Sequence, residues 1–148
     1  MLRGETILVP GNGLTDVQFL HTRDLVVAVS LALGADGLRH FTVLNVGNPA
    51  FCSFASYLET LSNVAGVGLE LASVPYEKLG LRPRQFFPFR DYPCVLATDA
   101  IQTQLGWAPE RTLRDGLVQT FESYDREVLA RSYPATEAEQ KIRLQIGC

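Results

Sequence analysis

Apolar runs rich in β-branched residues alternate along this chain with segments in which apolar residues recur every three or four positions. The first pattern predicts strands and the second predicts amphipathic helices. Predicted strands cover residues 6–9, 17–21, 41–46 and 67–74, and predicted helices begin at Thr22, Ser53, Asp99 and Thr112. Alternation of this kind is typical of an α/β layer arrangement.

Local signals mark the ends of these predicted helices. Gly34 and Gly66 follow the first two helices, and glycine is favoured just past a helix C-terminus. A serine such as Ser53 is a good N-cap because its hydroxyl accepts a hydrogen bond from a free backbone N–H group. The last two helices begin with capping-box patterns, formed by Asp99 with Gln102 and by Thr112 with Asp115. We expect the helix that begins at Thr112 to extend past Tyr124 to Val128.

The run at residues 41–46 is rich in apolar, strand-forming residues and ends at a Gly-Asn-Pro turn signal. Runs of this kind usually belong to strands that are buried on both faces, as in parallel sheets. We therefore expect a buried strand at residues 41–46.

At 148 residues, with 47% hydrophobic and 20% charged residues, the chain has room for one globular domain. We assign residues 1–131 to that domain. Residues 132–148 form a polar tail, either a short surface helix or a frayed end. The net charge of −3 argues against a generally basic nucleic-acid-binding surface, although it leaves room for a local basic patch.

Cysteine and histidine usage predicts neither a metal site nor a disulfide framework. The three cysteines are far apart, and the two histidines have no partners at metal-ligand spacing. Reduced thiols favour a cytoplasmic location. No apolar run approaches the roughly 18 residues that a membrane-spanning helix requires, so we expect no membrane association.

Several segments carry a resemblance to one known family. Residues 18–28 resemble the hV-x-DLA-x-A stretch of extended short-chain dehydrogenases, the NAD-dependent sugar epimerases and dehydratases. Residues 44–47 are similar to the family's YN-x-G strand, and residues 105–109 match its LGW-x-P signature. The resemblance covers about residues 7–131.

A narrower similarity, at residues 85–91 and 121–124, is to the branch of chloroplast stem-loop-binding proteins and their bacterial relatives. The resemblance implies an α/β fold, namely the carboxyl-terminal, substrate-side portion of an extended short-chain dehydrogenase that lacks most of the Rossmann domain. It also implies NAD or NADP as the cofactor of the intact family, and the plastid stroma as the location if the source is eukaryotic.

The residues that hold a dinucleotide in that family have no counterpart in this chain. A pyrophosphate cradle needs closely spaced glycines between a strand and a helix. The best local pattern, Gly11 and Gly13, lacks a third glycine because position 16 is Asp16. We therefore predict no cofactor-binding residues within the chain.

The family's catalytic base, a Tyr with a Lys four residues later, is also absent. The residues four positions after the five tyrosines are Leu61, Gly80, Leu96, Val128 and Glu137. We predict no catalytic residue and no redox activity for the chain alone. His21 is interpreted as a polar residue packed at a strand end, and Asp24 as a charge or cap in the first turn of the helix.

The candidate ligand-binding residues are Arg82, Arg84 and Arg90, in the proline-rich segment 81–92, which we predict not to be helical. Guanidinium groups bind phosphate through paired hydrogen bonds. In sugar-nucleotide epimerases the equivalent loop carries an Arg that holds the substrate diphosphate, so by resemblance these arginines are candidate phosphate ligands. The place where such epimerases have a further Arg, before the hV-x-DLA stretch, holds Val17 and Gln18.

Aromatic residues interleave with these arginines, and Phe86 and Phe89 are candidate stacking residues for the bases of single-stranded RNA. A plainer interpretation stays open. In it the phenylalanines belong to the core, and the arginines are solvated or paired with Asp91.

Three functions remain open from the sequence. The chain is a substrate-binding portion of a nucleotide-sugar epimerase or dehydratase, completed by a separate cofactor-binding subunit; or it is an RNA-binding module; or it is a truncated reading frame without an independent role. Without the cofactor domain's sheet, the strand at residues 41–46 is exposed, so we expect self-association or poor folding.

Overall fold

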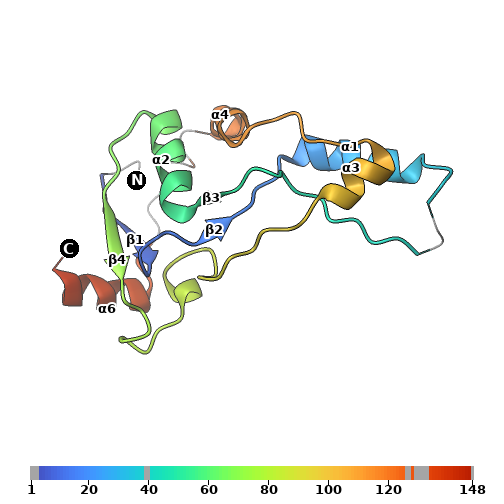
Figure 1. Ribbon diagram of the computed structural model, residues 1–148. Helices are drawn as coiled ribbons and strands as arrows, with labels where there is room; N and C mark the ends of the chain where they lie inside the picture. The colour runs from blue at the N-terminus through green and yellow to red at the C-terminus, as the bar shows by residue number, and fades with distance from the viewer. Residues whose placement is uncertain (1–3, 39–40, 126–127, 129–133, 148) are drawn as a thin grey trace.

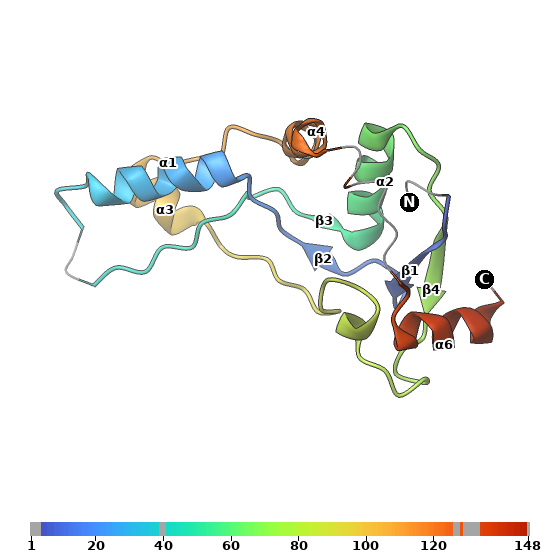
Figure 2. The same ribbon diagram turned by 180° about the vertical axis from the view of Figure 1, so that it is seen from behind.

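The computed structural model describes residues 4–38, 41–125, 128 and 134–147. Its elements form an elongated molecule with one group at each end (Figure 1). One group comprises β1 (Ile7–Pro10), β4 (Leu71–Val74), α2 (Phe54–Ala65) and α6 (Glu137–Ile146). The other comprises α1 (Thr22–Leu33) and α3 (Asp99–Leu105), as both views show (Figure 2). Between them lie β2 (Asp16–Val17), β3 (Cys52–Ser53) and α4 (Leu113–Ser123).

Two small sheets organise the chain. β1 and β4 form a parallel pair with Ile7 opposite Leu71, and a long crossover that contains α1 and α2 joins them. β2 and β3 pair in antiparallel fashion with Val17 opposite Cys52, and Val17 also forms a parallel bridge with Cys94. This mixed arrangement with a small parallel sheet confirms the predicted α/β class.

The larger core fills the space between the β1–β4 pair, α2, α6 and the segment that follows β4. Phe54, Val74 and Ile142 are fully buried in it. The ring of Phe54 meets Phe87 edge-on at 4.9 Å and stacks on Phe89 at 5.7 Å. Burial of each large apolar side chain contributes about 1.5–3 kcal/mol to folding, so this aromatic cluster is a main source of stability.

A second, smaller core lies at the far end of the molecule, around Ala28, Ile101 and Trp107. The half-buried side chains of Leu44 and Val46 pack against it. The buried residues of α1 are Asp24 and Ala28, whereas most of its large apolar side chains are exposed. No described helix is long and apolar enough to cross a membrane.

The first two helices have the predicted ends, with one difference. Ser53 caps α2 by accepting a hydrogen bond from Ser56 N at 3.2 Å, and Gly66 ends that helix in the left-handed conformation (φ 66°). Gly34 ends α1, also as predicted. The N-cap of α1 is His21 and not Thr22, because the His21 ring accepts the Arg23 amide at 3.2 Å.

The last two predicted helices differ more from the structure. Thr112 and Asp115 form the predicted capping box at the start of α4. The box at Asp99 is wrong, since Asp99 is already helical and the N-cap is Thr98, which makes no side-chain cap bond. α4 is shorter than predicted, because the extended backbone of Tyr124 (φ −81°, ψ 135°) ends it.

Three predicted strands are also corrected. Residues 41–46 are not a strand in the structure, since they pair with no described strand. The predicted strand at residues 17–21 shortens to β2, and the one at residues 67–74 begins only at Leu71, where pairing with β1 begins. β propensity therefore marks strand-like segments, but a pairing partner decides which become strands.

α6 lies within the predicted polar tail. It begins with a capping box between Thr136 and Glu139. Its Ile142 is fully buried in the larger core, and the Arg143 guanidinium donates to the Thr6 carbonyl at 3.1 Å. The alternative of a frayed end is wrong for these residues, since α6 is a docked helix.

We predict that Ile142→Ala lowers the free energy of unfolding by about 2–5 kcal/mol, because it leaves a cavity where a fully buried side chain packs against the core. Leu144→Ala is the matched control on the same helix: Leu144 is 86% exposed, so the expected change is below about 0.5 kcal/mol. Urea unfolding measures both. Equal effects of the two substitutions would show that α6 is not docked as described.

Candidate functional site

The predicted arginine segment surrounds a surface cavity of about 580 Å³. Arg82, Arg84 and Arg90 are all exposed and line it, together with Tyr76 and Tyr92. The structure therefore brings the three predicted phosphate ligands into one concave surface. We call this site the arginine cavity.

Local chemistry explains why the segment turns here. Pro83 occupies the first position of a short 3-10 helix (Pro83–Gln85), where its fixed backbone angle is favourable. The Gln85 side chain accepts the Arg82 amide at 2.6 Å, and the Thr136 hydroxyl donates to the Gln85 carbonyl at 3.1 Å. The prediction that the segment is not an α-helix is confirmed, with this single turn of 3-10 helix added.

The two phenylalanines that were candidate stacking residues pack inward. Phe86 is 9% exposed and belongs to the larger core. Phe89 is half-buried, with its ring against Phe19 at 5.9 Å and against Phe54 and Tyr57. Phe86 is buried, and Phe89 already stacks on Phe54, so no observation supports the predicted stacking role. The aromatic residues instead anchor the loop that carries the arginines.

Three arginines and one carboxylate, that of Asp91, line the arginine cavity. None of the three arginines forms an ion pair with a described acid, so the suggested pairing with Asp91 is not made. The Asp91 carboxylate instead accepts the Thr15 hydroxyl. Arg90 donates to the Tyr92 hydroxyl at 2.9 Å, and its guanidinium carbon lies 5.8 Å from the centre of the Tyr92 ring. A cation held in this way is partly oriented before any ligand binds.

Tyr76 supplies a hydrogen-bond donor at the edge of the same cavity. Burial raises the pKa of the Tyr76 hydroxyl, and its hydrogen bond with Asp91 raises that pKa further. The phenol therefore stays protonated at neutral pH and acts as a donor, not as a general base.

The turn between β1 and β2 does not fit a dinucleotide. Gly11 and Gly13 have positive φ angles of 55° and 71°, but the chain continues into a strand. The first amides of α2, at Phe54 and Ala55, donate to the carbonyls of Thr15 and Gly13, so they are not free to bind a phosphate. A Cβ atom on Gly11 would lie 3.2 Å from Asp91 Oδ2, so the space beside this glycine is closed by a carboxylate.

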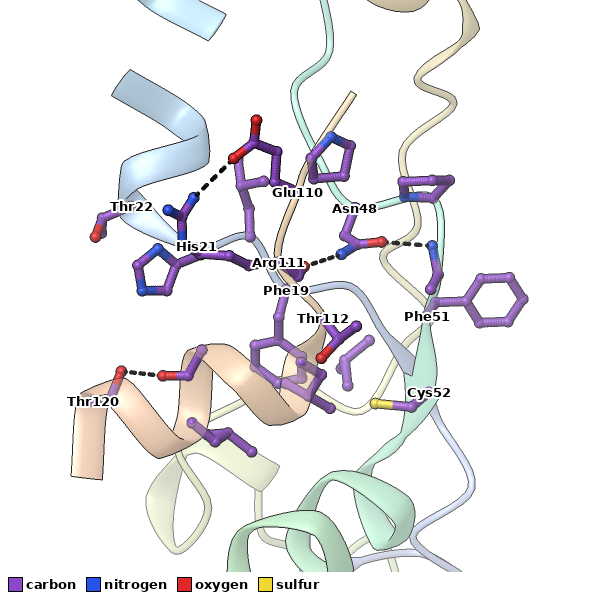
Figure 3. Close-up of a pocket in the computed structure, with 18 of the residues that line it drawn as sticks. Phe19, His21, Thr22, Asn48, Phe51, Cys52, Glu110, Arg111, Thr112 and Thr120 are labelled. Carbon is purple, nitrogen blue, oxygen red and sulfur yellow. Dashed lines mark hydrogen bonds and ion pairs between the residues drawn. The ribbon is translucent and has the colours of Figure 1, made fainter. Parts of the chain in front are cut away.

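A second cavity, which the sequence did not predict, lies between the start of α1, residues 48–52 and α4 (Figure 3). Its volume is about 490 Å³, and its walls are mainly apolar. The labelled side chains come from distant segments, including His21, Asn48, Cys52 and Arg111 (Figure 3). We call it the α4 cavity. No short sequence pattern predicts this cavity, because its lining residues come from segments that are far apart in the sequence.

The Asn48 side chain in the α4 cavity already has partners within the protein. The Asn48 amide donates to the Arg111 carbonyl at 3.0 Å and accepts from the Ala50 amide at 3.0 Å. Burial raises the pKa of the Cys52 thiol, and the Asp16 carboxylate raises it further, so this thiol is a poor nucleophile at neutral pH. Among the described residues, no group of three metal-ligating side chains occurs.

A buried ion pair closes the wall beside this cavity. Asp24, which is 2% exposed, accepts the Arg111 guanidinium at 2.5 Å and the Arg111 amide at 3.2 Å. The Trp107 indole donates to the Asp24 carbonyl at 3.2 Å. Asp24 does lie in the first turn of α1, as predicted, but its carboxylate binds Arg111 and does not cap the helix. The two sequence motifs that contain Asp24 and Trp107 are thus in direct contact.

Gln18 is the centre of a second group of polar contacts. It lies before the hV-x-DLA-like stretch, where sugar-nucleotide epimerases have an Arg. Its side-chain amide donates to the carbonyls of Asn48 at 2.7 Å and Leu96 at 3.2 Å. Its carbonyl accepts the Leu96 amide at 3.0 Å. One side chain therefore joins three segments, and it approaches Gly47 so closely that a Cβ there would lie 2.7 Å from Gln18 Oε1.

No family model matches the chain. It is 24% identical, over 80% of its length, to the chloroplast stem-loop binding protein of 41 kDa b of Arabidopsis thaliana, and 27% identical, over 84%, to the dTDP-glucose 4,6-dehydratase of Streptomyces niveus. These matches cover 31% and 34% of the relatives, so the chain spans about a third of their length.

Solved structures with the same fold include the UDP-glucose 4-epimerase of Thermotoga maritima with UDP-glucose (TM-score 0.66, 27% identity). Another is the dTDP-glucose 4,6-dehydratase of Bacillus anthracis in complex with NAD (TM-score 0.64, 20% identity). Each match covers 87% of this chain and 37% of the solved chain.

We predict that Gly47→Ala lowers the free energy of unfolding by about 1–3 kcal/mol, because the added Cβ displaces the Gln18 side chain from the carbonyl of Asn48 and the backbone of Leu96. Gly68→Ala is the control, since a Cβ there meets no atom within 4 Å. The measurement is chemical denaturation monitored by tryptophan fluorescence. A Gly47→Ala variant as stable as Gly68→Ala would disprove the close approach.

Proposed function

We propose that this chain, which matches in sequence and fold the carboxyl-terminal portion of NAD-dependent epimerases and dehydratases, binds a nucleoside-diphosphate sugar through the arginine cavity. The observation that carries the proposal is the gathering of three exposed arginines, without acidic partners among the described residues, around one concave surface. In this role the chain holds the ligand and performs no redox step by itself.

The chemistry of the cavity suits a diphosphate. Guanidinium groups bind phosphate oxygens through paired, charge-assisted hydrogen bonds, which contribute about 1.5–3 kcal/mol each. Arg82 and Arg84 flank Pro83, so the rigid 3-10 turn sets the spacing between their backbone positions. Arg90 approaches from the other end of the loop and is oriented by Tyr92.

The cavity also offers groups for the sugar. Asp91 lies among the lining residues, and a carboxylate has several lone pairs beyond those used by its present donors. Sugar hydroxyls are good donors to such an oxygen. The nucleoside gains no stacking from Phe86 in this arrangement, so the diphosphate and the sugar supply most of the recognition.

Binding of UDP-glucose tests the proposal. We predict that the Arg82→Ala/Arg84→Ala double variant weakens UDP-glucose binding by tenfold or more in isothermal titration calorimetry, because two phosphate ligands are removed. UDP is expected to retain most of the affinity, and uridine to bind far more weakly, since it has no phosphate.

Arg23→Ala is the control for the loss of positive charge. Arg23 is also exposed, but it lies on α1 and outside the arginine cavity, so its removal is expected to leave affinity within about twofold. Affinity for UDP-glucose that is equal in the double variant and in the native chain would contradict the proposal.

A second candidate ligand is single-stranded RNA, favoured by the similarity to a protein named for stem-loop binding. The same arginines would contact the phosphate backbone. We predict that each arginine replaced by alanine reduces the slope of log affinity against log salt by about 0.7 in filter binding of a single-stranded oligonucleotide. Absence of binding in a well-folded sample, or a slope that the substitutions leave unchanged, would exclude this candidate.

A further inference from the structure

Among the described residues, Asp91 is the one acidic side chain that lines the arginine cavity. Its carboxylate accepts the hydroxyl of Thr15, which precedes β2, and the hydroxyl of Tyr76, which follows β4. A Cβ atom on Gly11 would lie 3.2 Å from Asp91 Oδ2, so the turn after β1 also approaches this carboxylate closely. Segments that are far apart in the sequence therefore fix the position of one negative charge in the cavity.

The formal charges of the described lining residues leave an excess of two positive charges. The three arginines contribute three positive charges and Asp91 contributes one negative charge, while the other lining side chains carry no formal charge. Asp91 forms no ion pair with an arginine in the described part of the chain. Glu77 lies outside the lining, but its charge, like that of Asp91, raises the pKa of Tyr76. The negative potential is thus concentrated on the side of the cavity where Tyr76 lies.

This charge balance matches a nucleoside diphosphate that is joined to a neutral sugar. Such a ligand carries one negative charge on each of its two phosphate groups, and the excess positive charges of the cavity offset both. A uronic acid in place of the neutral sugar adds a carboxylate. No excess guanidinium charge remains for this third negative charge, and Asp91 is a like charge in the same cavity.

The size of the cavity makes this repulsion significant wherever the sugar lies in it. A sphere with the volume of the cavity is about 10 Å across, comparable with the Debye length of ~8 Å at physiological salt, so the repulsion is only partly screened. With an effective dielectric constant of ~20, two unit charges about 8 Å apart repel strongly enough to weaken binding roughly thirtyfold. Partial screening reduces this factor, so we expect a discrimination of about tenfold.

A neutral sugar, in contrast, gains from the same carboxylate. The hydroxyls of Thr15 and Tyr76 occupy two of the roughly four lone-pair positions of the Asp91 carboxylate. The remaining positions can accept hydrogen bonds from sugar hydroxyls. Asp91 therefore favours a hydroxyl group on the sugar and disfavours a carboxylate group there.

We propose that Asp91 makes the arginine cavity selective for nucleoside diphosphates of neutral sugars over those of uronic acids. The proposal rests on the function proposed above and adds the class of sugar that the site accepts. Asp91 acts here as a specificity-determining residue, since its charge discriminates between two ligands that share the same nucleoside and the same diphosphate.

Isothermal titration calorimetry with UDP-glucose and UDP-glucuronic acid tests the proposal on the native chain. UDP-glucose is expected to bind about tenfold more tightly. The ratio of the two affinities is expected to be larger at about 0.01 M salt than at about 0.1 M, because the Debye length falls from ~30 Å to ~10 Å over that range. Binding of UDP-glucose without this preference would overturn the proposal and leave the proposed function intact. A folded chain that binds neither nucleotide would overturn both.

Asp91→Asn isolates the effect of the carboxylate charge. The asparagine side chain keeps an oxygen that accepts hydrogen bonds from hydroxyl groups, but it carries no negative charge. The preference is expected to fall to within about twofold, mainly because UDP-glucuronic acid binds more tightly. Circular dichroism establishes that the variant is folded. An unchanged preference in folded Asp91→Asn would show that Asp91 does not determine the specificity.

Asp99→Asn is the matched control for the loss of one negative charge. Asp99 is exposed on α3, outside the arginine cavity, and α3 belongs to the group of elements at the other end of the molecule (Figure 1). Its substitution is expected to keep the native ratio of the two affinities. A ratio that falls equally in Asp99→Asn and Asp91→Asn would overturn the proposal, since the preference would then reflect the net charge of the chain.

Discussion

The buried ion pair between Asp24 and Arg111 is the constraint on which the end of the molecule formed by α1, α3 and the smaller core depends. It joins the first turn of α1 to the segment that leads into α4, across 87 positions of sequence. Removal of one partner of a buried pair typically costs about 3–5 kcal/mol; the Arg111 side chain is 23% exposed, which favours the lower end of that range. The Trp107 indole donates to the Asp24 carbonyl, so the same helix turn also positions the centre of the smaller core.

Gln18 extends this polar framework toward the larger core. It ties the strand that precedes α1 to the backbone of Asn48 and Leu96, while Asn48 in turn holds the Arg111 carbonyl. Specific hydrogen bonds thus connect two hydrophobic cores that are otherwise separate. The arrangement leaves the arginine cavity beside the larger core and the apolar sides of α1 at the opposite end.

Prediction from sequence succeeded where the physics is local. Ser53, Gly66 and the Thr112–Asp115 box act within one helical turn, and the structure has all of them. Prediction from sequence failed where the structure of a segment depends on residues that are distant in the sequence. The segment at residues 41–46 has a strand's composition but pairs with none of the described strands, and Phe86 shares a loop with arginines yet belongs to the core. The α4 cavity, Gln18 and the partner of Asp24 depend on contacts that no short pattern encodes.

The most direct test of this account is native-state hydrogen exchange at two amides that lie outside helices and strands. The Arg111 amide donates to Asp24, and the Leu96 amide donates to Gln18. We expect both to exchange as slowly as the Ile7 amide, which donates to the Glu70 carbonyl beside the parallel sheet. If both exchange as fast as amides in open loops, the polar framework does not hold the two cores together.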